Sequence, residues 1–138
     1  DRIFDRELAH VRASLEAGGS AQEKLLLFSD FMIEELKGMQ PLMPILLEFF
    51  SLAARKKHVM RRLNQYFRNY LEILTPVIQQ GIEGGEFRPV KAESAAIAVG
   101  AILEGTILLW VYDPETVDFE EFIASNVRLL LSGLRREA

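Results

Sequence analysis

The residues that could perform acid–base or metal chemistry are few and widely separated. His10 and His58 fall on different predicted helices, and neither has a carboxylate or a second histidine at the spacing of a metal site. Glu34 and Glu35 are consecutive, so on a helix they point to different faces and are better explained as solvated surface than as a carboxylate pair. The chain has no cysteine, which excludes disulfides, thiolate zinc ligands and cysteine nucleophiles and fits a reducing cytoplasm. The sequence therefore predicts no enzyme, no metal and no cofactor.

One strongly charged stretch stands out, the basic run RKKHVMRR at positions 55–62, followed by Arg68. Its functional interpretation is contact with phosphate or with the anionic head of a ligand. The simpler interpretation, which we favour, is the solvated face of a helix junction. The whole chain carries a net charge of −4, so it is not built as a whole to hold nucleic acid.

A set of aromatic and methionine residues falls on three consecutive predicted helices, on faces that should converge. Most belong to a core by default, but polar groups among apolar side chains are what a ligand pocket uses for orientation, and methionine adapts to varied ligand shapes. We expect some of the set to line an apolar cavity, with Tyr70 and Glu104 as polar contacts. Glu104 could instead meet an arginine or satisfy its charge across a dimer. The predicted lining is Phe28, Met32, Met43, Leu46, Phe50, Tyr66, Phe67, Tyr70, Glu104 and Leu108.

The stretch from Ala92 to Tyr112 is almost wholly apolar, with one acid, Glu104, near its middle. A helix that is apolar on every side must be covered on every side, and a chain of 138 residues can enclose only part of it. We expect a second copy to cover the rest, in a symmetric homodimer where this helix and the last one form a four-helix bundle. The central carboxylate and the lack of basic flanks argue against a membrane span. The predicted dimer contacts are Ala98, Ala101, Gly105, Val127, Leu130 and Leu131.

Helical periodicity and punctuation account for nearly the whole chain, and no convincing strand pattern is present. The pattern predicts helices over residues 2–16, 20–37, 41–55, 57–83, 92–112 and 118–134. Ser20 and Glu23 have the spacing of a capping box, Asp118 has that of an N-cap, and Gly38 is predicted to end the second helix. The expected fold is all-α, a bundle of five to six helices in one domain.

Several short phrases of the sequence resemble one protein family. They are GIEGGEFR at residues 81–88, EFFSLAAR at 48–55, and an alanine-rich helix leading into LEGTILLW at 103–110 and then Asp113-Pro114. Together they are similar to the C-terminal half of tetracycline-repressor-type (TetR family) regulators, and the similarity covers essentially the whole chain.

This resemblance implies a ligand-binding and dimerisation domain over residues 1–138, with residues 1–17 as the remnant of a connector helix to a missing DNA-binding domain. Such a domain would form a homodimer and bind a small apolar or amphipathic ligand. It would reach DNA only through the N-terminal helix-turn-helix of a longer parent protein, whose binding the ligand would alter. The alternatives are a helical dimerisation or interaction module without a ligand and, more distantly, a carrier of lipids or hydrophobic metabolites or an enzyme of unrecognised type.

Overall fold

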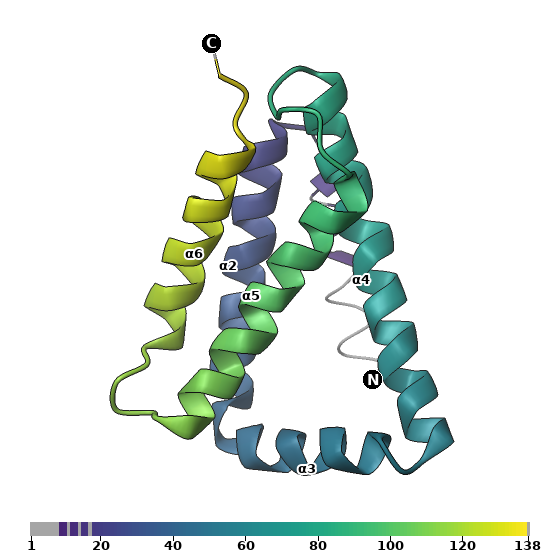
Figure 1. The fold of residues 1–138 in the computed structure, drawn as a ribbon, viewed down its shortest axis with the longest axis vertical. Helices are drawn as coiled ribbons and strands as arrows, with labels where there is room; N and C mark the ends of the chain where they lie inside the picture. Colours follow the sequence, from purple (N-terminus) through teal and green to yellow (C-terminus); the bar gives the residue numbers. More distant parts are fainter. Residues whose placement is uncertain (1–8, 11, 14, 17, 138) are drawn as a thin grey trace.

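The described part of the chain folds into helices that are joined by short connections (Figure 1). The computed structural model describes residues 9–10, 12–13, 15–16 and 18–137, and of Leu46 the backbone alone. The predicted helix over 2–16 and the connector over 1–17 therefore lie largely outside the described residues. The elements are α2 (Ala21–Met39), the 3-10 turn η1 (Gln40–Leu42), α3 (Met43–Ala53), α4 (Lys57–Glu83), α5 (Ala92–Tyr112) and α6 (Phe119–Leu134). The predicted all-α fold is confirmed.

Both predicted N-terminal caps are present. Ser20 Oγ accepts a hydrogen bond from the Glu23 amide at 3.1 Å, and Asp118 Oδ1 accepts one from the Glu121 amide at 3.2 Å. Each cap satisfies a backbone donor that the first turn of a helix leaves unpaired. These short-range signals therefore set where α2 and α6 begin.

The prediction that Gly38 ends the second helix is wrong, because α2 continues through Gly38 to Met39. A glycine that terminates a helix usually adopts a positive φ, whereas Gly38 is not among the described glycines with positive φ. The chain instead changes course at η1, where Pro41 occupies the first turn. Proline has no amide to continue the α-helical ladder, so it is the proline that ends α2.

Glu86, in the connection between α4 and α5, closes the N-terminus of α2 from far away in the sequence. Its carboxylate oxygens accept hydrogen bonds from the amides of Ala21 and Gln22, both at 2.9 Å. A carboxylate at this position also meets the positive end of the helix macrodipole. The backbone of residues 86–88 pairs in addition with that of residues 134–136, at N···O distances of 2.8 and 3.1 Å. Three segments distant in sequence are thus joined at this end of the bundle.

Helices α2, α4, α5 and α6 pack around the core, and α3 lies across the far end of the bundle (Figure 1). In this view α4 and α5 lie close together near the connection that joins them and diverge toward α3. The core holds the largest fully buried side chains, which include Phe28, Leu74, Ile78, Val99, Ile123 and Leu131.

Helix α5 has the length and composition of a membrane span, and it packs between α4 and α6. Only 28% of its most apolar 18-residue window is buried within the chain. Its buried residues, among them Ala96, Val99 and Leu103, share one side of the helix. The opposite side leaves apolar residues such as Leu109 and Tyr112 exposed, so the single chain covers one face of α5 only.

Candidate functional site

Tyr70 of α4 is the polar group that ties α4 to α5 where the two helices begin to separate. Its hydroxyl donates a hydrogen bond to the Ala96 carbonyl oxygen at 2.5 Å, and its ring packs against Phe28 with ring centres 5.8 Å apart. A Cβ atom on Gly100 would lie 3.2 Å from the Tyr70 ring and hydroxyl. The absence of a side chain at Gly100 therefore allows this close approach.

The electrostatic surroundings keep the Tyr70 phenol neutral. Burial raises the pKa of Tyr70 well above its usual range, the nearby Glu104 carboxylate raises it further, and the Gly100 backbone opposes them. Glu104 itself is exposed in the single chain. The phenol thus keeps its proton, which it donates to the Ala96 carbonyl oxygen, and its oxygen lies near the exposed Glu104 carboxylate.

The residues predicted to bind a ligand divide into a core group and an open group. Phe28 and Met43 are 1% and 2% exposed and belong to the core, and Met32 is partly buried against it. Tyr70 is half-buried, and the side chain of Leu46 lies outside the described residues. The open group, whose large apolar side chains are at least 38% exposed, is Phe50, Tyr66, Phe67 and Leu108.

The open group comes from α4 and α5, which diverge in Figure 1, and from α3, which lies across the end toward which they diverge. Phe50 is on α3, Tyr66 and Phe67 are on α4, and Leu108 is on α5. Gly100 and Glu104 are one turn apart on α5, so they share the face toward Tyr70, and Leu108 is one turn further on. The structure therefore brings Tyr70, Gly100 and Glu104 together.

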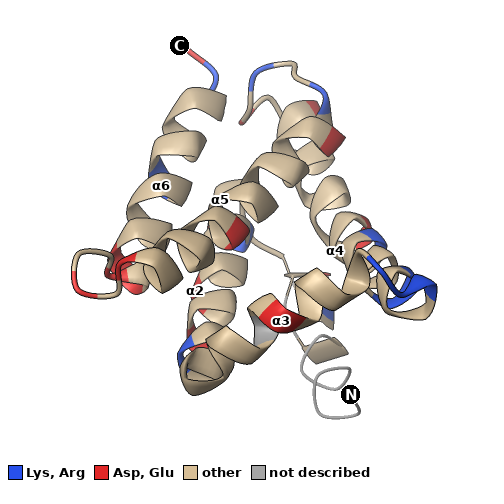
Figure 2. Cartoon of the chain, turned by 60° about the horizontal axis from the view of Figure 1, so that its bottom comes forward, with Lys and Arg blue, Asp and Glu red and all other residues tan. Residues whose placement is uncertain are grey.

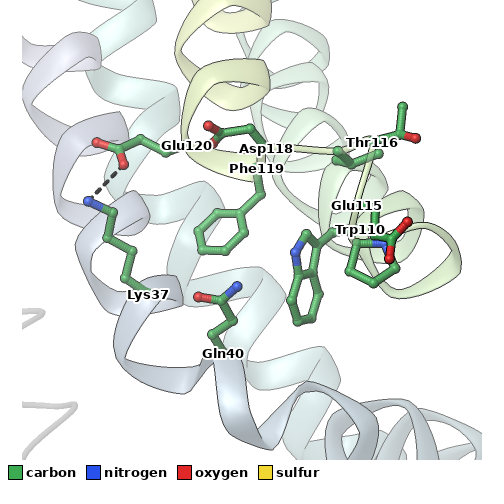
Figure 3. A pocket seen from close by; sticks show the side chains of 10 residues that line it. Lys37, Gln40, Trp110, Glu115, Thr116, Asp118, Phe119 and Glu120 are labelled. Atoms are coloured by element: carbon green, nitrogen blue, oxygen red, sulfur yellow. Dashed lines mark ion pairs between the residues drawn. The ribbon is translucent and has the colours of Figure 1, made fainter.

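A depression of about 350 Å³ lies at the C-terminal end of α2, beside the connection between α5 and α6 (Figure 3). Lys37 and Glu120 form an ion pair at 2.7 Å on its rim, and the hydrogen bond to Glu120 raises the pKa of Lys37. The rings of Trp110 and Phe119 meet edge to face, with centres 6.0 Å apart. None of the residues predicted to bind ligand lines this depression.

A second depression, of about 480 Å³, runs along α3. Its lining is Ile45, Glu48, Phe49, Ser51, Leu52 and Arg55. None of the predicted pocket residues whose side chains the structure describes lines it, and the one sequence signal in its lining is Arg55, the first residue of the basic run.

The predicted dimer residues also divide. Val127 and Leu131 are 1% and 2% exposed and fill the core of the chain itself, so no second copy can contact them in this arrangement. Ala98, Gly105 and Leu130 are half-buried, and Ala101 is exposed. The apolar side chains that α5 and α6 leave exposed are Ile97, Leu108, Leu109, Tyr112, Phe122 and Leu129.

The basic run at 55–62 forms the corner between α3 and α4, where Figure 2 shows Lys and Arg gathered. His58 is part of that corner, and both His58 and His10 are exposed. Among the described residues, no group of three His, Cys, Asp or Glu side chains could hold a metal ion.

Residues 21–133 match the protein family described as BetI-type transcriptional repressor, C-terminal. No curated protein matches the chain. Among solved structures it is similar to a TetR transcription regulator from Haloarcula marismortui ATCC 43049, with a TM-score of 0.79 and 21% identity over 96% of this chain and 71% of that one. It is also similar to FadR from Bacillus subtilis in complex with stearoyl-CoA, with a TM-score of 0.78 and 21% identity over 97% and 72% of the two chains.

A putative transcriptional regulator from Pseudomonas aeruginosa PAO1 has the same fold, with a TM-score of 0.77 and 23% identity over 96% of this chain and 64% of that one. At these identities the solved structures establish the fold. The family match covers α2 to α6 almost completely, and the family consists of regulators, not enzymes. The chain therefore belongs to the TetR-family regulators, as a C-terminal domain of the BetI type.

Proposed function

We propose that this domain senses a small apolar or amphipathic molecule and dimerises, and that ligand binding alters DNA binding by an N-terminal domain of the same regulator. The observation that carries the proposal is the family match over residues 21–133. The complex of the structurally similar FadR with stearoyl-CoA supports ligand sensing in this fold.

The ligand site we propose lies among α3, α4 and α5, at the open group Phe50, Tyr66, Phe67 and Leu108. A ligand that covers these exposed apolar side chains would be stabilised by roughly 25 cal/mol for each Å² of apolar surface removed from water. The Glu104 carboxylate and the Tyr70 hydroxyl, whose surroundings are described above, would orient the ligand there.

The mechanism we propose uses the divergence of α4 and α5. A ligand shifts an equilibrium between two arrangements only as far as its affinity for them differs, and about 1.4 kcal/mol of difference is tenfold. A ligand bound at the open group would favour the arrangement in which α3 and α4 stand further from α5. The helix before α2 would carry that displacement to the DNA-binding domain.

The homodimer we propose uses the exposed apolar face of α5 and α6. Leu129 and Tyr112 are 71% and 70% exposed in the single chain, and Gly105 has no atom within 4 Å of the position of a Cβ. A contact that covers this face in an obligate homodimer buries about 2,000 Å² or more in total.

A second candidate function is dimerisation without a ligand. It is favoured by Phe28 and Met43, which were predicted to line a pocket and instead fill the core. In that case the open group would be covered by other protein surface.

A thermal-shift screen of the protein distinguishes the two candidate functions, ligand sensing and dimerisation without a ligand. Apolar acids, amines and acyl-CoA are the probes, and a ligand should raise the melting temperature with the logarithm of its concentration once that concentration exceeds Kd. Phe67→Ala should abolish the shift and leave the ligand-free protein nearly as stable, because Phe67 is 45% exposed. Leu27→Ala, at a similarly exposed position on α2, is the matched control and should respond as the parent does. A shift that survives Phe67→Ala would place the ligand elsewhere, and no shift with any probe class would favour the ligand-free module.

A further inference from the structure

The depression along α3 is an apolar groove on the outside of that helix. Ile45, Phe49 and Leu52 are spaced by four and three residues, so they share one face. Ile45 is 61% exposed. This face is distinct from the proposed sensing site, since Phe50 of the open group lines no part of it. At about 480 Å³, the groove has a volume typical of sites for small organic ligands.

One end of the groove opens onto the basic corner. Arg55 lines the groove and is also the first residue of the basic run. No acidic residue lies between Glu48 and Glu72 in the sequence. Within the described part of the chain, Arg55, Lys56 and Lys57 form no ion pair. Their charges are therefore available to an anion.

The start of α4 adds to the positive potential at this corner. Lys56 is the N-cap, no side chain caps the helix, and its first turn has no acidic residue. This helix of 27 residues begins here, so the positive pole of its macrodipole lies at the corner. Its first amides also have no intrahelical partners. By contrast, side chains cap the first turns of α2 and α6.

Among the described residues that line the groove, Glu48 is the one acid. It lies within α3, whereas Arg55 lies seven residues further on, in the turn after the helix ends at Ala53. The end of the groove at Arg55 is therefore positive, and the remainder is apolar with one carboxylate at its side. This polarity along the groove matches a molecule with an apolar tail and an anionic head.

We propose that the outer groove of α3 binds a single anionic amphiphile, with its alkyl chain against Ile45, Phe49 and Leu52 and its phosphate or carboxylate head at Arg55, Lys56 and Lys57. Nucleic acid is disfavoured because the rest of the chain is acidic and the corner adjoins apolar surface. This site is additional to the proposed sensing site and does not depend on it.

The test uses dodecyl phosphate below its micellar concentration, with binding measured by calorimetry and located by amide chemical shifts. The expected shifts fall on residues 45–61, and dodecyl phosphate should bind at least tenfold more tightly than dodecanol or dodecyltrimethylammonium. Shortening the alkyl chain should weaken binding by roughly fourfold for each buried methylene removed. Raising the salt concentration should weaken it as well, because the head-group contact is ionic.

Matched variants separate the charge of the corner from the charge of the whole chain. Arg55→Glu should weaken binding about tenfold, which corresponds to about 1.4 kcal/mol. Arg68→Glu makes the same change in net charge at an exposed position of α4 outside the groove, and should change affinity less than twofold. Glu48→Gln should strengthen binding. Ile45→Ser should weaken it without loss of fold, because Ile45 is already exposed.

Several results would overturn the proposal. If inorganic phosphate bound as tightly as dodecyl phosphate, the apolar groove would contribute nothing to binding. If dodecyltrimethylammonium bound as tightly, the positive charge of the corner would contribute nothing. Shifts at Tyr70 and Glu104 instead of residues 45–61 would assign the amphiphile to the sensing site. If the protein were retained on vesicles containing anionic lipid but did not bind monomeric dodecyl phosphate, this surface would be a membrane contact. Binding of duplex DNA through Arg55 at the same ionic strength would make it a nucleic-acid contact.

Discussion

Gly81 of α4 faces the ring of Phe87, and a Cβ atom at Gly81 would lie 2.6 Å from Cε2 of that ring. The same atom would lie 2.8 Å from Cβ of Ala21, at the start of α2. All three residues are buried, Phe87 and Ala21 at 1% and 0% exposure. Glycine at position 81 is thus what lets the α4–α5 connection fold back onto α4 beneath α2.

We expect Gly81→Ala to destabilise the domain by about 1–3 kcal/mol, the usual cost of adding a methyl group to a filled core. Gly38→Ala is the matched control, because Gly38 also lies in a helix but has no atom within 4 Å of the Cβ position. It should stabilise the domain by about 0.5–1 kcal/mol through helix propensity alone. Urea denaturation followed by circular dichroism measures both. Equal effects of the two substitutions would contradict the packing described for Phe87.

Substituting Glu86 should loosen the start of α2. Glu86→Gln keeps one acceptor oxygen but loses the charge, so we expect a loss of about 1 kcal/mol, and about 2 kcal/mol for Glu86→Ala. Glu83→Gln, nearby and exposed, should have an effect below about 0.5 kcal/mol. Hydrogen exchange at the amides of Ala21 and Gln22 provides a local readout. Unchanged protection of these amides in Glu86→Ala would show that the carboxylate is dispensable.

Tyr70 predicts a specific dependence of stability on alkaline pH. Its pKa in the folded state is raised, so the folded protein holds this proton more tightly than the unfolded chain does. The corresponding stabilisation is complete below pH about 10, the ordinary pKa of tyrosine, and is lost as the pH rises through the folded-state value. Tyr70→Phe should cost about 1 kcal/mol near pH 8 for the lost hydrogen bond. This cost should shrink as the pH is raised toward 11. A difference in unfolding free energy between Tyr70→Phe and the parent that stays constant with pH would contradict the raised pKa of Tyr70.

The proposed dimer predicts which substitutions produce monomers. Leu129→Arg on α6 and Gly105→Arg on α5 should each give monomer or aggregate in light scattering, because each places a charge in the apolar contact. Leu27→Arg, on the exposed side of α2, should remain dimeric. Intact dimers in both Leu129→Arg and Gly105→Arg would place the contact on another surface.

The domain alone should bind duplex DNA only non-specifically, given its net charge of −4. Such binding loses orders of magnitude as salt rises to physiological strength. A gel shift at about 150 mM salt compares this domain with a longer protein that also has a helix-turn-helix, which should bind a roughly palindromic site. Specific binding by the domain alone would contradict the division of roles and make the basic run the first place to mutate.

The sequence predicts those parts of the fold that depend on near neighbours. Ser20 and Asp118 each lie three residues before the amide they cap, so the spacing itself reveals the contact. The Glu86 cap joins amides 64 and 65 residues away. No periodicity connects positions so far apart, and only the packed structure brings them together.

The candidate surfaces are harder to predict because one helical stripe cannot serve two roles. The spacing of Val127 and Leu131 correctly marks an apolar face of α6, but the chain's own core covers that face. Leu129 lies between them in sequence and points outward. Likewise, Phe28 and Phe67 are both aromatic residues at helical spacing, and one is buried while the other is open because α4 and α5 diverge. That divergence is a property of helix crossing, which side-chain type alone does not encode.

The junction of residues 21, 86 and 136 has a consequence for how the chain acquires its structure. Each of its hydrogen bonds closes a long loop, and such contacts are entropically costly until the helices they join are in place. Helices α2 and α4 can form and meet early, but the partner of the Glu86 carbonyl is the amide of Arg136. During synthesis the pairing of residues 86–88 with residues 134–136 can therefore form only after residue 136 has left the ribosome. Until then the apolar faces of α2 and α5 that α6 will cover remain exposed to chaperones and to other unfinished chains.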